Sequence, residues 1–190
     1  MCGDIIVQIQ NEVERVCVFD LDGTLWKVNS HIDIVENFFG KKIYSSIIGK
    51  LLYRVMPRQY MKMLNHDYAR IPQEFIDRYN PIFRQDAIDL LEMEKSRNSY
   101  VMVISNAPVE ILATVQRRLG IDVLQAEVGK KDQVLKSVVS TWSNLLVVTD
   151  NLTDASLLEL ATEAVIYTPH KRKKKFLELS LPLKKEFRKS

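Results

Sequence analysis

The sequence predicts an α/β protein, with a parallel sheet covered by helices on both faces and a small helical cap inserted into it. Short apolar runs rich in β-branched residues alternate along the chain with segments whose apolar residues recur at helical spacing. One longer stretch after the first run shows helical spacing alone. A length of 190 residues suits a single core with one such insertion.

The apolar runs mark the expected strands. The first covers residues 16–21 and leads into Asp-Gly-Thr, and the others cover 100–104, 121–124, 145–148 and 164–167. Runs that are apolar throughout are typical of strands buried on both faces of a parallel sheet. Together they predict a Rossmann-like core, in which functional side chains gather where the strands end.

Helical patterns occupy the segments between these strands, over residues 86–95, 109–119, 132–139 and 155–161. The second of them places its apolar residues on one face, and Gly120 follows as a C-terminal stop. Strand and helix therefore alternate through the second half of the chain.

The long helical stretch follows the first strand. Its apolar residues keep helical spacing from residue 32 to residue 55, and Pro57, Pro72 and Pro81 mark the expected breaks. We therefore expect a catalytic core of residues 1–26 and 85–190, a helical cap of residues 27–84, and a basic C-terminal tail over residues 170–190.

Composition and charge are those of a soluble globular protein, with 46% hydrophobic and 27% charged residues. The net charge of +3 is uneven, because residues 170–190 carry +7 and the remainder carries −4. Such a basic run is usually a solvated surface, although it can also contact anionic partners. No specific nucleic-acid signature accompanies it.

The two cysteines, Cys2 and Cys17, indicate neither a disulfide framework nor a thiolate metal site. Cys17 lies in an apolar run, where a small buried side chain is expected. The first residues lack the basic start and apolar stretch of a secretory signal, and no run reaches the roughly 18 apolar residues that span a bilayer. We therefore expect a cytoplasmic protein.

The candidate chemistry centres on Asp20 and Asp22, which follow the first strand. Period two puts both side chains on one side wherever the chain stays extended, and their repulsion then favours a bound cation or a use for the proton. Gly23 and Thr24 allow a tight turn whose N–H groups face an anion. A carboxylate that attacks a phosphate needs a metal and a nearby acid, and this pair can supply both.

The segment 18–25, Val-Phe-Asp-Leu-Asp-Gly-Thr-Leu, resembles the first motif of the haloacid dehalogenase-like (HAD) phosphatase superfamily. The other motifs of that family are matched in order by Ser105 after the next core strand, by Lys131 at the start of a helix, and by Asp150 with Asp154 after an apolar strand. The insertion between the first two motifs is similar to the helical cap of the phosphoserine phosphatase-like branch.

The resemblance implies a magnesium-dependent phosphohydrolase. Asp20 would attack phosphorus and form an aspartyl-phosphate, and Asp22 would protonate the leaving oxygen and then activate water. The implied ligands of Mg²⁺ are Asp20, the main-chain carbonyl of Asp22, and Asp150. The implied phosphate-binding residues are Gly23, Ser105, Asn106 and Lys131, with Asp154 and Asn151 in supporting positions.

Each of these residues also has an ordinary structural explanation. Ser105 and Asn106 suit the cap of the helix that follows them, and Asp150 suits another cap. Lys130 and Lys131 can both be surface charges, and only register with the family motif favours Lys131.

Two departures from the family pattern occur in the fourth motif. Thr149 stands where Gly is frequent and Asn151 where Ser is frequent, but neither change removes a charged group. Asp22 argues against dehalogenation, because that branch keeps no carboxylate at this place. Hydrolysis of a small-molecule phosphomonoester is the leading prediction. The alternatives are phosphoryl transfer to another acceptor and a degenerate core that acts as a binding module.

The substrate does not follow from the resemblance. The phosphoserine enzyme has a Glu nine positions after the nucleophile, whereas this chain has Asn29, and Asp33 or Glu36 takes that place only after a shift of register. Residues 41–62 hold six Lys or Arg and no acid, interleaved with apolar side chains. This stretch suits ordinary packing, an anionic or amphiphilic substrate, or an anionic membrane surface.

Overall fold

A computed structural model describes residues 12–179 and 184–189, so Cys2 and the rest of the first eleven residues lie outside the described part. The strands are β1 (Val13–Phe19), β2 (Tyr100–Ser105), β3 (Asp122–Gln125), β4 (Trp142–Thr149), β5 (Glu163–Tyr167) and β6 (Lys184–Arg188). The α-helices are α1 (Ser30–Phe39), α2 (Ile47–Val55), α3 (Pro57–Tyr68), α4 (Gln73–Arg78), α5 (Gln85–Ser96), α6 (Val109–Leu119), α7 (Lys131–Val138), α8 (Ala155–Leu158) and α9 (Lys173–Glu178). Two 3-10 turns, η1 (Leu152–Asp154) and η2 (His170–Arg172), complete the described elements.

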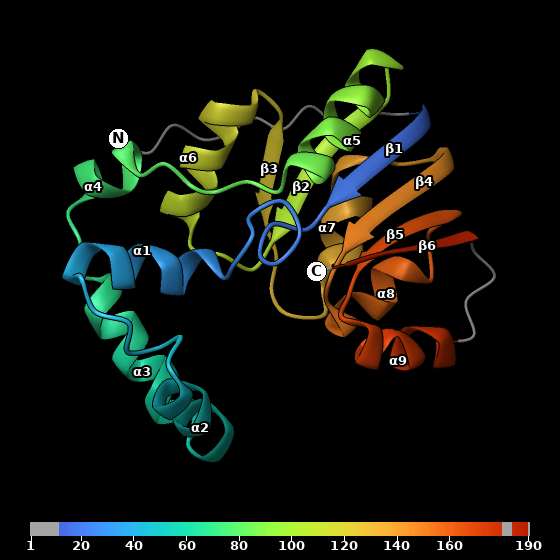
Figure 1. Cartoon of the computed structure of the whole chain (residues 1–190). Helices are drawn as coiled ribbons and strands as arrows, with labels where there is room; N and C mark the ends of the chain where they lie inside the picture. Colours follow the sequence, from blue (N-terminus) through green and yellow to red (C-terminus); the bar gives the residue numbers. More distant parts are fainter. Residues whose placement is uncertain (1–11, 180–183, 190) are drawn as a thin grey trace.

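The strands form one parallel sheet in the order β3-β2-β1-β4-β5-β6 (Figure 1). The chain reverses its direction of travel across the sheet between β1 and β4, because β2 and β3 lie on one side of β1 and β4 to β6 on the other. In sheets of this kind ligands bind at the carboxyl ends of the strands beside that reversal. The predicted α/β class with a Rossmann-like sheet is confirmed.

Alternate residues of β1 enter two different cores. Cys17 and Phe19 pack with side chains of α5 and α6 on one face of the sheet. Val16 and Val18 pack on the other face with side chains of α7, α8 and α9. A strand covered on both faces needs apolar residues at every position, which explains the unbroken apolar run in the sequence.

The helices α1–α4 lie between β1 and β2 in the chain. The segments that lead into and out of this insertion run side by side, because Arg84 N donates to Leu25 O at 2.8 Å and Lys27 N donates to Ile82 O at 3.1 Å. Beyond α1, the helices α2 and α3 extend as a hairpin away from the sheet (Figure 1). The expected helical insertion is therefore present.

The expected strands and helices of the core are found, with several shifted ends. β1 ends at Phe19 instead of residue 21, and α8 ends at Leu158 instead of residue 161. Residues 184–188, expected to belong to a basic solvated tail, form the edge strand β6 beside β5. An edge strand has one free side and needs no apolar run, so charged residues hid it in the sequence.

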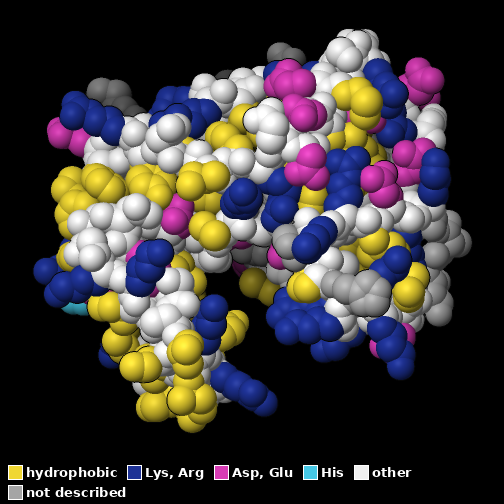
Figure 2. Space-filling view, viewed as in Figure 1, with side chains coloured by type: hydrophobic (Ala, Val, Ile, Leu, Met, Phe, Trp, Pro, Cys, Tyr) yellow, Lys and Arg dark blue, Asp and Glu magenta, His cyan; other side chains and the backbone are white. Residues whose placement is uncertain are grey.

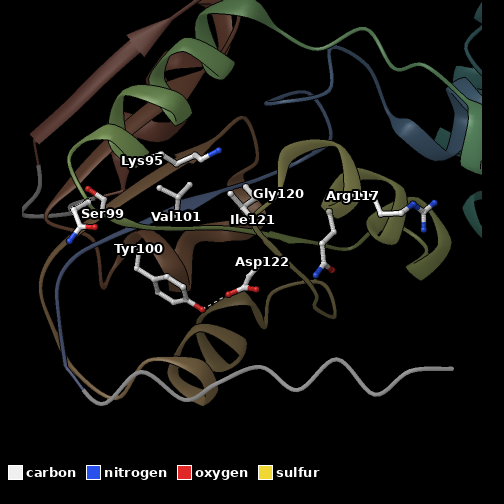
Figure 3. Close-up of a pocket in the computed structure, with 10 residues that line it drawn as sticks. Lys95, Ser99, Tyr100, Val101, Arg117, Gly120, Ile121 and Asp122 are labelled. Carbon is white, nitrogen blue, oxygen red and sulfur yellow. Dashed lines mark hydrogen bonds between the residues drawn. The ribbon is translucent and has the colours of Figure 1, made fainter.

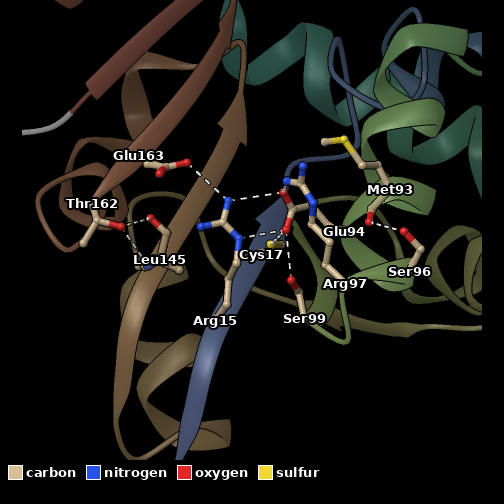
Figure 4. A network of polar contacts seen from close by, with 10 residues as sticks. All are labelled: Arg15, Cys17, Met93, Glu94, Ser96, Arg97, Ser99, Leu145, Thr162 and Glu163. Carbon is tan, nitrogen blue, oxygen red and sulfur yellow. Dashed lines mark hydrogen bonds and ion pairs between the residues drawn. The ribbon is translucent and has the colours of Figure 1, made fainter.

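A network of charged side chains joins elements at the amino end of the sheet (Figure 4). Arg15 on β1 donates to Glu94 on α5 at 2.8 Å and to Glu163 on β5 at 3.2 Å. Cys17 donates to Glu94 at 3.3 Å, and burial, followed by the Glu94 charge, raises the pKa of its thiol to about 12. Cys17 is therefore a buried, protonated thiol, as its apolar surroundings predict.

Candidate active site

The loop after β1 turns back on itself directly after the first carboxylate. Asp20 N still donates to Val148 O at 2.8 Å, but Trp26 N then donates to Leu21 O, and Gly23 N donates to Trp26 O, both at 2.8 Å. Gly23 has a φ of 76°, a conformation that glycine adopts without strain. Period two would align Asp20 with Asp22 only in an extended chain, and this condition is not met because the backbone turns after Asp20.

Asp20 is paired with a buried lysine. Its carboxylate accepts a hydrogen bond from Lys131 Nζ at 2.6 Å, and Lys131 is the first residue of α7. The same Nζ lies 2.9 Å from Asp154, and the Lys131 side chain is only 2% exposed. Lys130 is exposed and pairs with Glu127 instead, so the geometry distinguishes the two lysines that the sequence left open.

Carboxylates outnumber cations around this lysine. Burial raises the pKa of Asp20 to about 7; Lys131 opposes this shift, and Asp154 and Asp150 add to it. Burial and then the charge of Asp154 raise the pKa of Asp150 to about 6. Buried carboxylates that raise one another's pKa are the surroundings that favour a divalent cation.

Asp154 is held in place by Thr149 as well as by Lys131. The Thr149 hydroxyl donates to Asp154 Oδ2 at 2.6 Å, and both residues are buried. Asp154 Oδ1 is also buried and has no hydrogen-bond partner in the described chain. In the sequence Thr149 stands out only as a departure from Gly, and the one signal of this contact is a hydroxyl five positions before an acid.

Asp150 lies against the turn that follows β1. A Cβ atom placed on Gly23 would be 2.3 Å from Asp150 Oδ2, so only glycine lets the two loops approach this closely. Asp150 follows β4, and Asp20 follows the neighbouring β1. The structure therefore brings the first and fourth motifs together at the reversal point of the sheet.

The residues here suit Mg²⁺ by their chemistry. Within the residues that the structure describes, no cluster of three His, Cys, Asp or Glu side chains could hold a metal alone. The expected set has only two carboxylates, from Asp20 and Asp150, together with the Asp22 carbonyl. Mg²⁺ commonly binds through one or two carboxylates and fills its other positions with water and phosphate. The buried Asp154 Oδ1, which has no hydrogen-bond partner in the described chain, adds an unsatisfied oxygen beside Lys131.

Asp22 has partners of its own on the insertion. Its two carboxylate oxygens accept hydrogen bonds from Ser30 N at 2.9 Å and from Asn29 Nδ2 at 3.0 Å, at the N-terminus of α1. Burial raises the pKa of Asp22, and the hydrogen bonds from Ser30 oppose this shift. Asp22 thus links the core turn to the first helix of the insertion.

Ser105 and Asn106 do not cap the following helix. α6 begins at Val109 after Pro108, without a hydrogen bond from any capping side chain. Ser105 is 1% exposed, and its hydroxyl accepts a hydrogen bond from Ala107 N at 3.2 Å. Asn106 donates to Ala126 O at 2.7 Å.

Of the remaining predicted site residues, Asn151 caps η1, where its side chain accepts a hydrogen bond from Thr153 N. Ser105 is the last residue of β2, the neighbour of β1, so it lies at the same carboxyl end of the sheet as Asp20.

Arg84 is a residue that the sequence analysis missed. Its guanidinium donates to Gly23 O at 3.1 Å and to Thr24 O at 3.2 Å, and it lies 4.6 Å from the centre of the Tyr167 ring. Arg84 thereby links the turn after β1 to the end of β5. A lone arginine in a connecting segment gave no signal of this role.

Asp33 and Glu36, the two cap acids that a shift of register would bring to the place of the phosphoserine enzyme's Glu, already accept hydrogen bonds within the protein. Asp33 accepts hydrogen bonds from Trp26 Nε1 at 3.0 Å and from Tyr79 OH at 2.8 Å. Glu36 accepts from the backbone and hydroxyl of Ser45. Neither acid therefore offers a free carboxylate to an amino acid substrate.

Two hollows lie elsewhere on the surface. One, of about 650 Å³, is at the amino end of β2 beside Tyr100 (Figure 3), and its cations Lys95 and Arg117 already contact Glu92 and Asp77. The other, of about 750 Å³, lies between α2–α3 and Val128. Only the second is beside the loop that leads to Lys131.

The sequence model of the haloacid dehalogenase-like hydrolases matches residues 17–164, a range that contains every carboxylate described above. The chain belongs to this family. No curated protein matches this HAD hydrolase in sequence.

Solved structures share its fold. A phospho-aspartyl intermediate analogue of phosphoserine phosphatase is 16% identical, with a TM-score of 0.60 over 93% of this HAD hydrolase and 95% of that chain. A phosphoserine phosphohydrolase-like protein from Francisella tularensis subsp. tularensis SCHU S4 is 18% identical, with a TM-score of 0.59 over 90% and 93%. A substrate-bound phosphoserine phosphatase is 14% identical, with a TM-score of 0.58 over 93% and 94%. At these identities the likeness establishes the fold.

Proposed function

We propose that this HAD hydrolase cleaves phosphomonoesters through an aspartyl-phosphate on Asp20, with Mg²⁺ as its cofactor. The observation that carries the proposal is the buried Asp20 carboxylate, 2.6 Å from Lys131. It lies at the carboxyl end of β1, beside β4, where the strand order of the sheet reverses. The carboxylate excess suits a divalent cation, which together with Lys131 would offset the negative charge of a phosphate that Asp20 attacks.

Mg²⁺ would be held by Asp20, Asp150 and the Asp22 carbonyl, and it would neutralise charge on the phosphoryl oxygens. Lys131 would face the same oxygens, and Asp154 would orient Lys131 through the 2.9 Å contact. The Ser105 hydroxyl and the N–H groups of the Gly23 turn would donate further hydrogen bonds to the phosphoryl group.

The reaction would proceed in two displacements. Asp20 attacks phosphorus, the bond to the leaving oxygen breaks, and Asp22 gives that oxygen a proton. Water then attacks the phosphorus of the aspartyl-phosphate, Asp22 takes its proton, and inorganic phosphate leaves. The raised pKa of Asp22 suits a group that must hold a proton and return it.

We also propose that residues 27–84 act as a cap on the core formed by residues 1–26 and 85–190. The paired segments at Leu25 and Arg84 support this division, because both connections cross at one junction. The bonds from Asn29 and Ser30 to Asp22 would make the acid's orientation depend on where the cap sits.

The proposed substrate class is a phosphomonoester with an amphiphilic or anionic remainder. The hollow beside Val128 is lined by Tyr53, Met61 and the cations Arg58 and Lys62. Apolar walls with two cations would suit such a remainder better than a zwitterionic amino acid.

The test is phosphate release from an aryl phosphate, with and without Mg²⁺, followed by a panel of natural phosphate esters. Asp20→Asn is expected to lower turnover by at least about a thousandfold. Asp89→Asn, which changes an exposed aspartate on α5, is the matched control and should retain turnover. Turnover that survives Asp20→Asn, or that needs no divalent cation, would exclude the proposed chemistry.

A further inference from the structure

The α2–α3 hairpin exposes large apolar side chains on one helix face. Ile47 is 87% exposed, Ile48 80%, Leu51 60% and Val55 68%. Their spacing on α2 places them on a common stripe. A stripe of this size is unusual on a surface that meets only water, and it indicates an interaction site.

The same hairpin is basic. Its exposed cations are Lys50, Arg54, Arg58 and Lys62, and the exposed Lys41 and Lys42 lie in the segment that leads into α2. The segment from 41 to 62 contains no acid, and none of these cations forms an ion pair with any residue that the structure describes. In Figure 2 the end of the hairpin is mainly hydrophobic, with Lys and Arg side chains beside it.

We infer that the α2–α3 hairpin docks on the surface of an anionic lipid bilayer. The apolar stripe would enter the interface, and the cations would contact lipid phosphates. Helices of 9 and 12 residues can lie in that interface. No helix in the described ranges is long and apolar enough to cross a bilayer.

Charge complementarity favours lipid over a second copy of the chain. Two identical basic hairpins repel each other, whereas an anionic bilayer matches both the cations and the apolar stripe.

A second basic surface lies on the same side of the molecule. It consists of Lys171, Arg172, Lys174 and Lys175 with the half-exposed Leu177, on η2 and α9, which lie with α2 in the lower part of Figure 1.

The test is flotation of the full chain with vesicles of phosphatidylcholine alone and of phosphatidylcholine mixed with phosphatidylglycerol. The wild type should float only with the anionic vesicles, and less as salt is raised. Ile47→Ser with Ile48→Ser, and separately Lys50→Gln with Arg54→Gln, should each lower the partition coefficient by about tenfold or more.

The controls change matched residues outside the hairpin. Ile82→Ser with Val109→Ser removes apolar side chains that are 70% and 53% exposed, and Lys136→Gln removes an exposed cation. These variants should float like the wild type.

The inference fails if the wild type ignores anionic vesicles or if the hairpin variants float normally. Dimers in sedimentation that vanish in the Ile47 and Ile48 variant would instead assign the stripe to a second copy. Flotation does not depend on turnover, so this result stands apart from the proposed phosphatase activity.

Discussion

At the residue scale, the Thr149 hydroxyl and Lys131 together set the position of Asp154. Thr149 donates to Asp154 Oδ2 at 2.6 Å, while the other oxygen has no partner in the described residues. The threonine at position 149, where the family motif often has glycine, therefore has a structural role in this chain. It supplies the donor that keeps a buried carboxylate directed at Lys131.

Thr149→Val is expected to destabilise the fold by about 1–3 kcal/mol, because it leaves Asp154 less well paired. It should also lower phosphate release by about tenfold, since Lys131 loses a well-oriented partner. Urea unfolding and phosphate release measure the two effects.

Thr114→Val is the matched control for that change. Thr114 is also buried, but its hydroxyl donates to Glu110 O within α6 at 3.1 Å. It should cost stability without changing turnover. Equal activity in the two variants would show that Thr149 has no part in the site.

At the element scale, the turn after β1 is where core and insertion meet. Asp150 lies against Gly23 on one side, Arg84 donates to the carbonyls of the turn, and Asp22 accepts hydrogen bonds from the start of α1. A short loop with three different attachments cannot move without disturbing the proposed metal ligands.

Gly23→Ala tests this packing. The new methyl group would overlap Asp150 Oδ2, so Asp150 must shift, and we expect the Mg²⁺ concentration for half-maximal turnover to rise by about tenfold or more. A titration of phosphate release against Mg²⁺ measures the shift.

Gly120→Ala separates that clash from backbone strain. Gly120 has a φ of 61°, close to the 76° of Gly23, but nothing lies within 4 Å of its added Cβ. Both variants should lose about 1 kcal/mol of stability from the left-handed backbone. A similar Mg²⁺ requirement in both would rule out the Asp150 contact as the cause.

At the scale of the whole molecule, the Glu94 network holds β1, α5 and β5 together far from the site. Although burial alone raises the pKa of Glu94, hydrogen bonds from Arg15, Ser99 and Cys17 outweigh it and lower the pKa to about 2. The folded state therefore binds fewer protons than the unfolded state between the usual 4.5 and about 2.

This sign fixes the pH dependence. The stabilisation from Glu94 is fully present above pH 4.5 and is lost as the pH falls through about 2. Glu94→Gln should therefore lower the free energy of unfolding by about 3 kcal/mol at neutral pH, with a difference that shrinks on acidification. Urea unfolding over a pH series measures it.

Glu92→Gln on the same helix is the control. The Glu92 side chain is 55% exposed and pairs with Lys95 at the surface, so its change should have little effect at any pH. A Glu94→Gln difference that stays constant with pH would show that the carboxylate charge is not the source of the stability.

The sequence alone determined the fold class, most of the elements and the positions of the candidate motifs. Strands buried on both faces must be apolar throughout, and functional residues follow where such strands end, so Asp20 stood out directly, whereas Ser105 and Asp150 were selected by their match to the family motifs. These features depend on local patterns, namely apolar runs, helical spacing and short motifs, which are visible in the sequence itself.

Tertiary structure decided which of the candidates meet. Lys131 and not Lys130 contacts Asp20, Thr149 holds Asp154, Arg84 holds the turn, and Asp22 binds the start of α1. The edge strand β6 was also invisible in the sequence because one of its sides is free. Each of these contacts depends on how separate elements pack or on how the backbone turns. The direction of a side chain within a loop is set by the residues packed around it, and spacing along the chain does not reveal it.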